Sequence, residues 1–344
     1  MIKKSFSKLS YYYEIYRKMH LLRSMPYIWN YIKYRSLPHK TTMSTKRFTP
    51  QIAALVLTWR CNLSCDFCNV GDQLNPKGWR DYEATLEKVQ RIFANPLFSN
   101  CLMVDLYGGE PLLVKELIPI VSWLSKRGHI TNVTTNGLHL LKHIDDLKRV
   151  GISRINISLY DENQSFLQDN LSKINQIFPV HTSIVLERSK VEKEQDKLLQ
   201  IARFVHDAGC RSLRVWIYRP LGVTNPQPEE IYDTLPAYIE FKRKMEEILP
   251  GFCLWSPPLQ TGKVKKLCPQ LWQRINTDMS GKMAICCGET KLNGPNTNFF
   301  DTYDEPDVLF NHPTLVNLRK NLLNPVSDPP IMCKNCNLLG DDGW

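Results

Sequence analysis

Cysteine spacing is the feature of this sequence that points most directly to chemistry. Seven of the eleven cysteines fall into two spaced groups. The first group comprises Cys61, Cys65 and Cys68, in the run CNLSCDFC. Three thiolates bind three irons of a 4Fe-4S cubane and leave the fourth iron open, whereas a structural zinc ion needs a fourth protein ligand close by. The spacing therefore favours a cluster that also binds an exogenous ligand, with zinc as the alternative.

The second group lies near the end of the sequence. Cys268 opens the run CPQLWQRINTDMSGKMAICC, and Cys333 and Cys336 follow as CKNC. With one member of the adjacent pair Cys286 and Cys287, they make four thiolates, which can saturate a second 4Fe-4S cluster or hold zinc. We expect the other three cysteines to be packing residues: Cys101, Cys210 and Cys253.

A glycine-rich motif, YGGEP, follows the second predicted strand. Together with the CxxxCxxC loop after the first strand, it resembles the radical S-adenosylmethionine (SAM) superfamily over roughly residues 50–340. The resemblance implies that SAM chelates the open iron and that Phe67, the aromatic residue before the third cysteine, lies near its adenine. It also implies that the motif binds the SAM amino group, with glycines because the backbone must approach the ligand closely. The motif residues are Gly108, Gly109, Glu110 and Pro111.

Two further positions resemble family sites for the SAM ribose and carboxylate. Asn136 precedes Gly137 at the end of the third strand, in TTNG, and Ser158 lies in the fourth strand, in NISLY. The alternatives are an Asn-Gly turn that caps a helix and an ordinary small strand residue. The resemblance therefore implies SAM contacts from three successive strand ends.

The second cysteine group resembles the twitch domain, the shortened relative of the SPASM domain found after radical SAM barrels. The resemblance implies one auxiliary 4Fe-4S cluster on four thiolates, and the spacing from Gly281 favours Cys286 over Cys287 as the fourth ligand. Cys287 would then lie beside the cluster, where some relatives place a catalytic acid or base. It is the candidate catalytic residue, and a small buried thiol is the alternative.

The family resemblance also implies a reaction. The first cluster, reduced by a flavodoxin- or ferredoxin-type donor, would cleave SAM to methionine and a 5′-deoxyadenosyl radical, which removes hydrogen from a substrate C–H. Electron transfer to the auxiliary cluster would oxidise the substrate, whereas hydrogen return from Cys287 would epimerise it. We expect oxidation of a small metabolite, sugar or cyclitol, with ribosomal-peptide modification as the alternative. A non-catalytic iron-sulfur or zinc scaffold would leave the GGEP motif unexplained.

The elements that must position these residues alternate along the chain. Six β-rich runs are predicted strands: 52–58, 101–107, 130–135, 154–159, 180–186 and 212–218. Helical stretches lie between and after them: 81–94, 112–127, 138–149, 163–176, 191–208 and 229–248. This alternation favours parallel strands joined by crossover helices. We therefore predict an α/β fold, a partial (β/α)6 TIM-like barrel with its site at the C-terminal ends of the strands.

Three segments are predicted. Residues 1–48 form a basic aromatic extension with eleven Lys/Arg against one acid, whereas the remainder is neutral by count. The barrel spans 49–250, and a small irregular twitch/SPASM-like domain spans 251–344, where prolines interrupt the alternation and metal ligands would fix the loops. The extension suits a membrane surface, an anionic partner or a helix packed on the barrel. A basic segment alone is a weak signal for nucleic acid.

Size, composition and the absence of membrane or signal patterns indicate an intracellular protein. The 344 residues, 43% of them apolar, suffice for one large α/β domain or for a barrel plus a smaller domain. No apolar run approaches the roughly 20 residues of a membrane span, and no secretory signal pattern opens the sequence. We expect a cytoplasmic protein, with attachment to the membrane periphery as an alternative, in which cysteines serve metals rather than disulfides.

Overall fold

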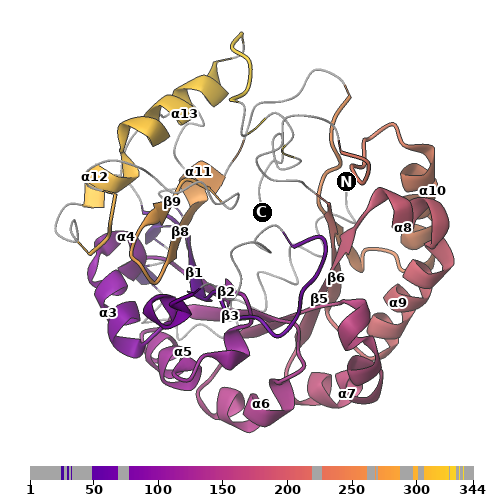
Figure 1. The fold of residues 1–344 in the computed structure, drawn as a ribbon, viewed down its shortest axis with the longest axis horizontal. Helices are drawn as coiled ribbons and strands as arrows, with labels where there is room; N and C mark the ends of the chain where they lie inside the picture. The colour runs from indigo at the N-terminus through magenta and orange to yellow at the C-terminus, as the bar shows by residue number, and fades with distance from the viewer. Residues whose placement is uncertain are drawn as a thin grey trace.

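A single curved sheet with helices on its outer side organises the molecule (Figure 1). The computed structural model describes residues 49–68, 77–218, 227–261, 270–286, 297–300, 306–324 and 326–330, together with residues 25, 26, 29, 30, 32, 268, 333 and 336. Within these residues the sheet has nine strands in the order β7-β6-β5-β4-β3-β2-β1-β8-β9. The predicted α/β class with a mostly parallel sheet is confirmed.

The six predicted strands are all present, and each pairs in parallel with the next. Their bounds are β1 Ile52–Thr58, β2 Met103–Gly108, β3 Ile130–Thr135, β4 Arg154–Ser158, β5 Val180–Leu186 and β6 Ser212–Ile217. Six of the seven β1 residues are buried, as expected for a central strand of a helix-covered parallel sheet. Sequential parallel order puts the ends of β1 to β6 on one edge, where the predicted site residues lie.

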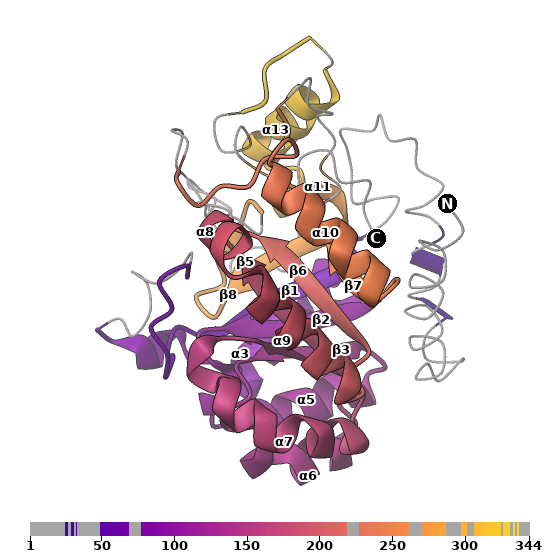
Figure 2. The same cartoon turned by 90° about the vertical axis from the view of Figure 1, so that its right-hand side faces the viewer.

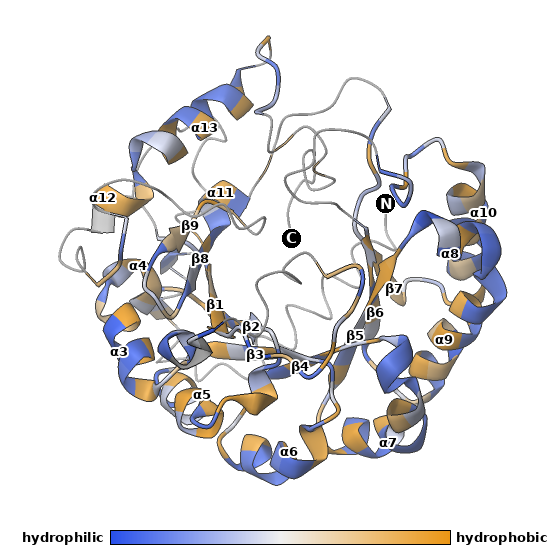
Figure 3. Ribbon diagram, viewed as in Figure 1, coloured by the Kyte–Doolittle hydropathy of each residue, from blue (hydrophilic) through white to orange (hydrophobic). Residues whose placement is uncertain are grey.

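The outer layer consists of the crossover helices, which form an arc around the strands (Figure 1). Their bounds are α3 Leu86–Ala94, α4 Pro96–Ser99, α5 Leu117–Lys126, α6 Leu140–Arg149, α7 Gln164–Ile177, α8 Arg188–Lys193, α9 Gln195–Asp207 and α10 Pro236–Ile248, with 3-10 turns η2 Trp79–Tyr82, η3 Pro111–Leu113 and η4 Asp161–Asn163. Apolar and polar residues alternate at helical spacing along them (Figure 3). In α3, for example, Val89, Ile92 and Phe93 are buried. This amphipathic pattern holds the helices on the sheet.

The region after residue 250 is more regular than expected. Strand β7 (Cys253–Trp255) pairs in parallel with β6, and β8 (Arg274–Asp278) pairs in parallel with β1, so both extend the barrel sheet. Strand β9 (Met283–Ala284) pairs antiparallel with β8. The sequence did not indicate these strands because β7 and β9 are very short and β8, RINTD, has no apolar run.

Three helices accompany these strands: α11 Gln270–Gln273, α12 Pro306–Phe310 and α13 Pro313–Leu323. Arg319 of α13 is buried, and its guanidinium donates to the carbonyl oxygens of Leu271 at 3.0 Å and Phe310 at 2.8 Å. Burial lowers the Arg319 pKa to about 10. This one side chain therefore links all three helices through their backbones.

The three cysteines expected to pack are all buried, which confirms that expectation: Cys101, Cys210 and Cys253. Burial raises the pKa of each thiol, to about 12 for Cys210 and Cys253. Among the described residues, no helix combines the length and the apolarity needed to cross a bilayer.

Candidate active site

The loop after β1 holds the first cysteine group at the C-terminal edge of the sheet. Cys61, Cys65 and Cys68 are half-buried, and none of them forms a disulfide. Cys65 and Cys68 lie at the two ends of a turn, in which the Cys68 amide donates to the Cys65 carbonyl at 3.0 Å. The Leu63 amide donates to the Cys61 sulfur at 3.5 Å. All three thiols thus lie on one short loop whose backbone is ordered by local hydrogen bonds.

The electrostatics of this loop fit a cationic cluster. Burial raises the pKa of Cys61, and burial raises that of Cys65 to about 12. Repulsion adds a smaller rise to both pKa values, from Glu110 and then Cys68 for Cys61, and from Glu162 and then the other two thiolates for Cys65. In the described residues, no three His, Cys, Asp or Glu side chains lie close enough together to hold a single metal ion. A 4Fe-4S cluster does not require its cysteines to share one metal ion, since each thiolate binds a different iron.

The YGGEP motif packs directly against the cysteine loop. The amides of Gly109 and Glu110 donate to the carbonyls of Thr58 at 2.8 Å and Arg60 at 2.7 Å. A Cβ on Gly108 would lie 2.5 Å from the Thr58 oxygen, and one on Gly109 would lie 2.1 Å from the Arg60 oxygen. The backbone at the end of β1 and in the cysteine loop is therefore too close to admit a side chain at either glycine, whether or not a ligand also approaches them.

Glu110 is the acidic residue of this motif, and its carboxylate is buried, 1% exposed. It accepts hydrogen bonds from the Leu112 amide (2.9 Å), the Thr135 hydroxyl (2.7 Å) and the Asn136 amide (2.8 Å). Burial raises its pKa, and these three donors lower it in part. The side chain thus joins the ends of β2 and β3. Pro111, also buried, begins η3 directly after it.

We expect Glu110→Ala to weaken SAM binding by at least about tenfold, since it removes the charged partner predicted for the SAM amino group. Three buried donors would also lose their acceptor, so the free energy of unfolding should fall by about 3 kcal/mol. Equilibrium binding of SAM to the cluster-loaded protein, with denaturant unfolding alongside, measures both.

Glu116→Ala is the matched control, because Glu116 also accepts a backbone amide, that of Leu86 at 2.8 Å, and belongs to no predicted SAM contact. It should leave SAM affinity unchanged. A folded Glu110→Ala protein with wild-type SAM affinity would contradict the role predicted for Glu110.

Asn136 is buried at the end of β3 and its side chain is engaged by the protein. Its amide nitrogen donates to Asn62 Oδ1 at 2.9 Å, and its Oδ1 accepts the Leu138 amide at 3.1 Å. Its backbone carbonyl accepts Asn163 Nδ2 at 2.6 Å. Asn136 therefore ties the cysteine loop to β3 and the turn after β4. Asn136 would have to make the predicted contact with the SAM ribose or carboxylate in addition to these hydrogen bonds.

Ser158 lies at the end of β4, next to an aromatic residue that the sequence did not single out. Its hydroxyl is 3.3 Å from that of Ser183 and also hydrogen-bonds the Tyr160 hydroxyl. The Tyr160 ring lies 5.5 Å from the ring of Phe67, the predicted adenine neighbour. The Lys190 ammonium lies 5.2 Å from the same Phe67 ring. Phe67 is therefore held between β4 and α8, at the edge of the cysteine loop.

The second cysteine group is partly described. Cys268, Cys286, Cys333 and Cys336 form no disulfide, and they are half-buried and packed against the apolar core. Cys333 and Cys336 share a turn, with the Cys336 amide donating to the Cys333 carbonyl at 3.1 Å. Half-buried cysteines that form no disulfide fit a thiolate ligand set. Cys287, the candidate hydrogen donor, lies outside the described residues.

Polar side chains line the sheet face opposite the outer helices, a feature the sequence prediction missed. They alternate with core residues such as Val104 and Ile155 along successive strands. One appears on each of five neighbouring strands: Asp105, Asn132, Asn156, Ser183 and Arg214. The sequence did carry a signal for this polar face, namely the alternation of polar and apolar residues along these strands. A parallel strand buried on both faces shows no such alternation.

Hydrogen bonds and an ion pair join several of these inner-face residues to their neighbours. Asn132 Nδ2 donates to Asp105 Oδ1 at 3.2 Å, and Asn156 Nδ2 donates to Ser183 Oγ at 3.1 Å. Arg274 of β8 forms an ion pair with Asp105 at 2.9 Å. Most of these side chains are only half-buried. The inner face can therefore offer both donors and acceptors to a polar ligand.

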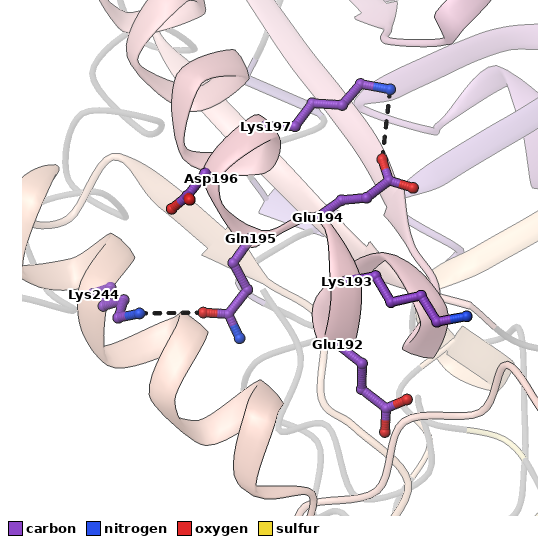
Figure 4. A pocket seen from close by; sticks show the side chains of 7 residues that line it. All are labelled: Glu192, Lys193, Glu194, Gln195, Asp196, Lys197 and Lys244. Carbon is purple, nitrogen blue, oxygen red and sulfur yellow. Dashed lines mark hydrogen bonds and ion pairs between the residues drawn. The ribbon is translucent and has the colours of Figure 1, made fainter.

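A separate pocket of about 450 Å³ lies outside the barrel, where the junction of α8 and α9 faces α10 (Figure 4). Lys244 Nζ donates to Gln195 Oε1 at 3.4 Å, and Lys197 pairs with Glu194 at 3.5 Å. The lining is almost entirely charged: Glu192, Lys193, Glu194, Gln195, Asp196, Lys197 and Lys244. None of the predicted site residues lines it, so it is not part of the candidate active site.

Known proteins resemble this chain from β1 to the start of α10. The model of the radical SAM superfamily matches residues 55–235. The GTP 3′,8-cyclase of Aquifex aeolicus is 30% identical over 194 residues, which cover 51% of this chain and 58% of that protein. The GTP 3′,8-cyclase of Listeria monocytogenes serovar 1/2a is 27% identical over 202 residues, covering 54% and 59%. The chain thus spans under two thirds of the length of these curated relatives.

Among solved structures, Streptococcus suis SuiB bound to its precursor peptide SuiA matches with a TM-score of 0.63 at 15% identity, covering 85% of this chain and 70% of that one. SuiB bound to S-adenosylmethionine matches with a TM-score of 0.61, also at 15% identity, covering 79% and 68%. At this identity the similarity demonstrates a shared fold.

Proposed function

This chain belongs to the radical SAM superfamily, and we propose that it is a SPASM/twitch-type oxidoreductase that oxidises a small metabolite, such as a sugar or cyclitol. A reduced 4Fe-4S cluster on Cys61, Cys65 and Cys68 would supply the electron that cleaves SAM and generates a radical able to remove substrate hydrogen. The rest of the site holds the cysteine loop in place through Gly109 and Asn136.

The polar inner face of the sheet is the observation that carries the proposed substrate class. Its side chains come from the core of the barrel, so their positions are fixed by the strand ladder. Asp105 and Asn156 offer an acceptor and an amide, and Arg214 adds a cation. A polyhydroxylated molecule satisfies such groups better than an apolar one does, because buried donors and acceptors left unpaired are costly.

Oxidation requires an electron acceptor. Loss of a hydrogen atom leaves a substrate radical, which must release one more electron and one proton to give the oxidised product. Four half-buried cysteines that form no disulfide support an auxiliary 4Fe-4S cluster as that acceptor: Cys268, Cys286, Cys333 and Cys336. A flavodoxin- or ferredoxin-type protein would reduce the first cluster.

GTP cyclisation is a second candidate, favoured by the names of the curated relatives. A nucleotide could also use the polar inner face. Ribosomal-peptide modification, by cross-linking or by epimerisation with Cys287 as donor, is the third.

The test supplies reduced, cluster-loaded protein and SAM with the low-mass fraction of a cell extract, with GTP, or with buffer, and measures 5′-deoxyadenosine. The low-mass fraction should stimulate its formation, and one component should reappear lighter by two hydrogens. Cys268→Ala should retain the stimulation and lose the oxidised product, whereas the packing-residue control Cys210→Ala should retain both. The proposal would be contradicted if only GTP stimulated 5′-deoxyadenosine formation, or if Cys268→Ala still formed the oxidised product.

A further inference from the structure

An apolar stripe is exposed near the N-terminus, outside the candidate active site. The described residues Met25, Trp29 and Ile32 are helical and 54%, 59% and 49% exposed. At about 100° per residue, these three positions fall within about 60° of one another around a helix axis. The helical residues that carry the stripe are drawn in indigo at the right of Figure 2. A coherent face of this kind differs from scattered single apolar residues, which are normal on protein surfaces.

Asn30 fixes the direction of this face. It is 8% exposed and donates to the Thr49 carbonyl at 3.0 Å and the Thr49 hydroxyl at 2.8 Å, while its Oδ1 accepts the Thr49 amide at 2.8 Å. Its amide nitrogen also lies 3.5 Å from the Asn100 carbonyl. By helical spacing, the stripe lies at least about 100° around the axis from Asn30. Hydrogen bonding on one side therefore holds the apolar residues on the other side toward solvent.

The anchor also places the stripe away from the active site. Thr49 precedes β1 and Asn100 precedes β2, so both lie at the edge of the sheet where these strands begin. The cysteine loop follows β1 and therefore lies at the opposite edge. Whatever covers Met25, Trp29 and Ile32 would leave the C-terminal ends of the strands accessible.

Charge indicates what covers this face. Residues 1–48 contain eleven Lys/Arg and one acid, Glu14, whereas the remaining 33 basic and 33 acidic residues balance. An interfacial helix combines an aromatic and aliphatic face with basic residues that attract anionic headgroups. We propose that Met25, Trp29 and Ile32 dock this enzyme on an anionic lipid surface, with the candidate active site facing away from the bilayer. This inference does not depend on the proposed substrate.

Vesicle binding tests the proposal with the full-length, cluster-loaded protein. The probes are phosphatidylcholine vesicles containing about 30 mol% phosphatidylglycerol and vesicles of phosphatidylcholine alone. Wild type should co-sediment with the anionic vesicles and not with the neutral ones, and raising the salt concentration should weaken binding. The triple variant Met25→Ser, Trp29→Ser, Ile32→Ser should partition at least about tenfold less.

Ile239→Ser is the matched control, because Ile239 is a single apolar residue of α10 that is 53% exposed. It should bind vesicles as wild type does, and both variants should cleave SAM at the wild-type rate. Three results would overturn the proposal: no binding of wild type to anionic vesicles, undiminished binding by the triple variant, or a wild-type dimer in sedimentation that the triple variant makes monomeric. The last would assign the face to a second copy of the chain.

Discussion

Replacement of Gly109 by alanine should separate the cysteine loop from the end of β2. The added Cβ would lie 2.1 Å from the Arg60 carbonyl oxygen and 3.2 Å from the Cys61 nitrogen. Both neighbours are backbone atoms, so the contact is relieved only if the loop moves. We expect the free energy of unfolding to fall by at least about 3 kcal/mol. Iron bound by the loop should fall as well, as measured by denaturant unfolding and iron analysis.

Gly251→Ala is the control for Gly109→Ala. Gly251 has φ +76°, so alanine there is strained by about 1–2 kcal/mol, but nothing lies within 4 Å of the added carbon. It should leave the iron content unchanged. If Gly109→Ala were no less stable than Gly251→Ala and held full iron, the close packing of the motif on the cysteine loop would be contradicted.

Simultaneous replacement of Cys61, Cys65 and Cys68 by alanine should halve the iron content. Wild type reconstituted without oxygen should hold about eight irons per chain, and the variant about four, because each 4Fe-4S cluster has its own thiolate set. Cys210→Ala, which removes a buried packing thiol, should retain about eight. A wild-type content near four, with zinc in the second group, would contradict the auxiliary cluster. An unchanged content in the triple variant would contradict the assignment of the loop.

The barrel was predictable from sequence because each of its first six strands can be recognised from the hydrophobic pattern within its own short run of residues. The run IAALVLT sets β1 at Ile52–Thr58, as predicted, and the other five predicted strands also match closely. Strands β7 and β8 were not predictable in the same way. Their pairing with β6 and β1 depends on contacts far apart in the sequence, which a short or polar run does not reveal.

The site was predictable at its motifs and not at the contacts that position them. Spacing predicted the cysteines, and the family resemblance predicted Glu110 and Asn136; the structure brings Glu110 and Asn136 into contact with each other and Asn136 into contact with the cysteine loop. Their long-range partners, Thr135 for Glu110 and Asn62 for Asn136, follow from the register of neighbouring strand ends. The glycines were predicted from close approach to a ligand, and the structure adds close approach to the Arg60 backbone.

The production of 5′-deoxyadenosine from SAM tests the central claim most directly. Cluster-loaded wild type, given a strong one-electron reductant and SAM, should form 5′-deoxyadenosine and methionine in equal amounts. The variant lacking Cys61, Cys65 and Cys68 should form neither above background, whereas Cys268→Ala should still form both. Cleavage that persists without the three loop thiols, or no cleavage by reduced wild type with its full iron content, would contradict the assignment of this loop as the site of SAM chemistry.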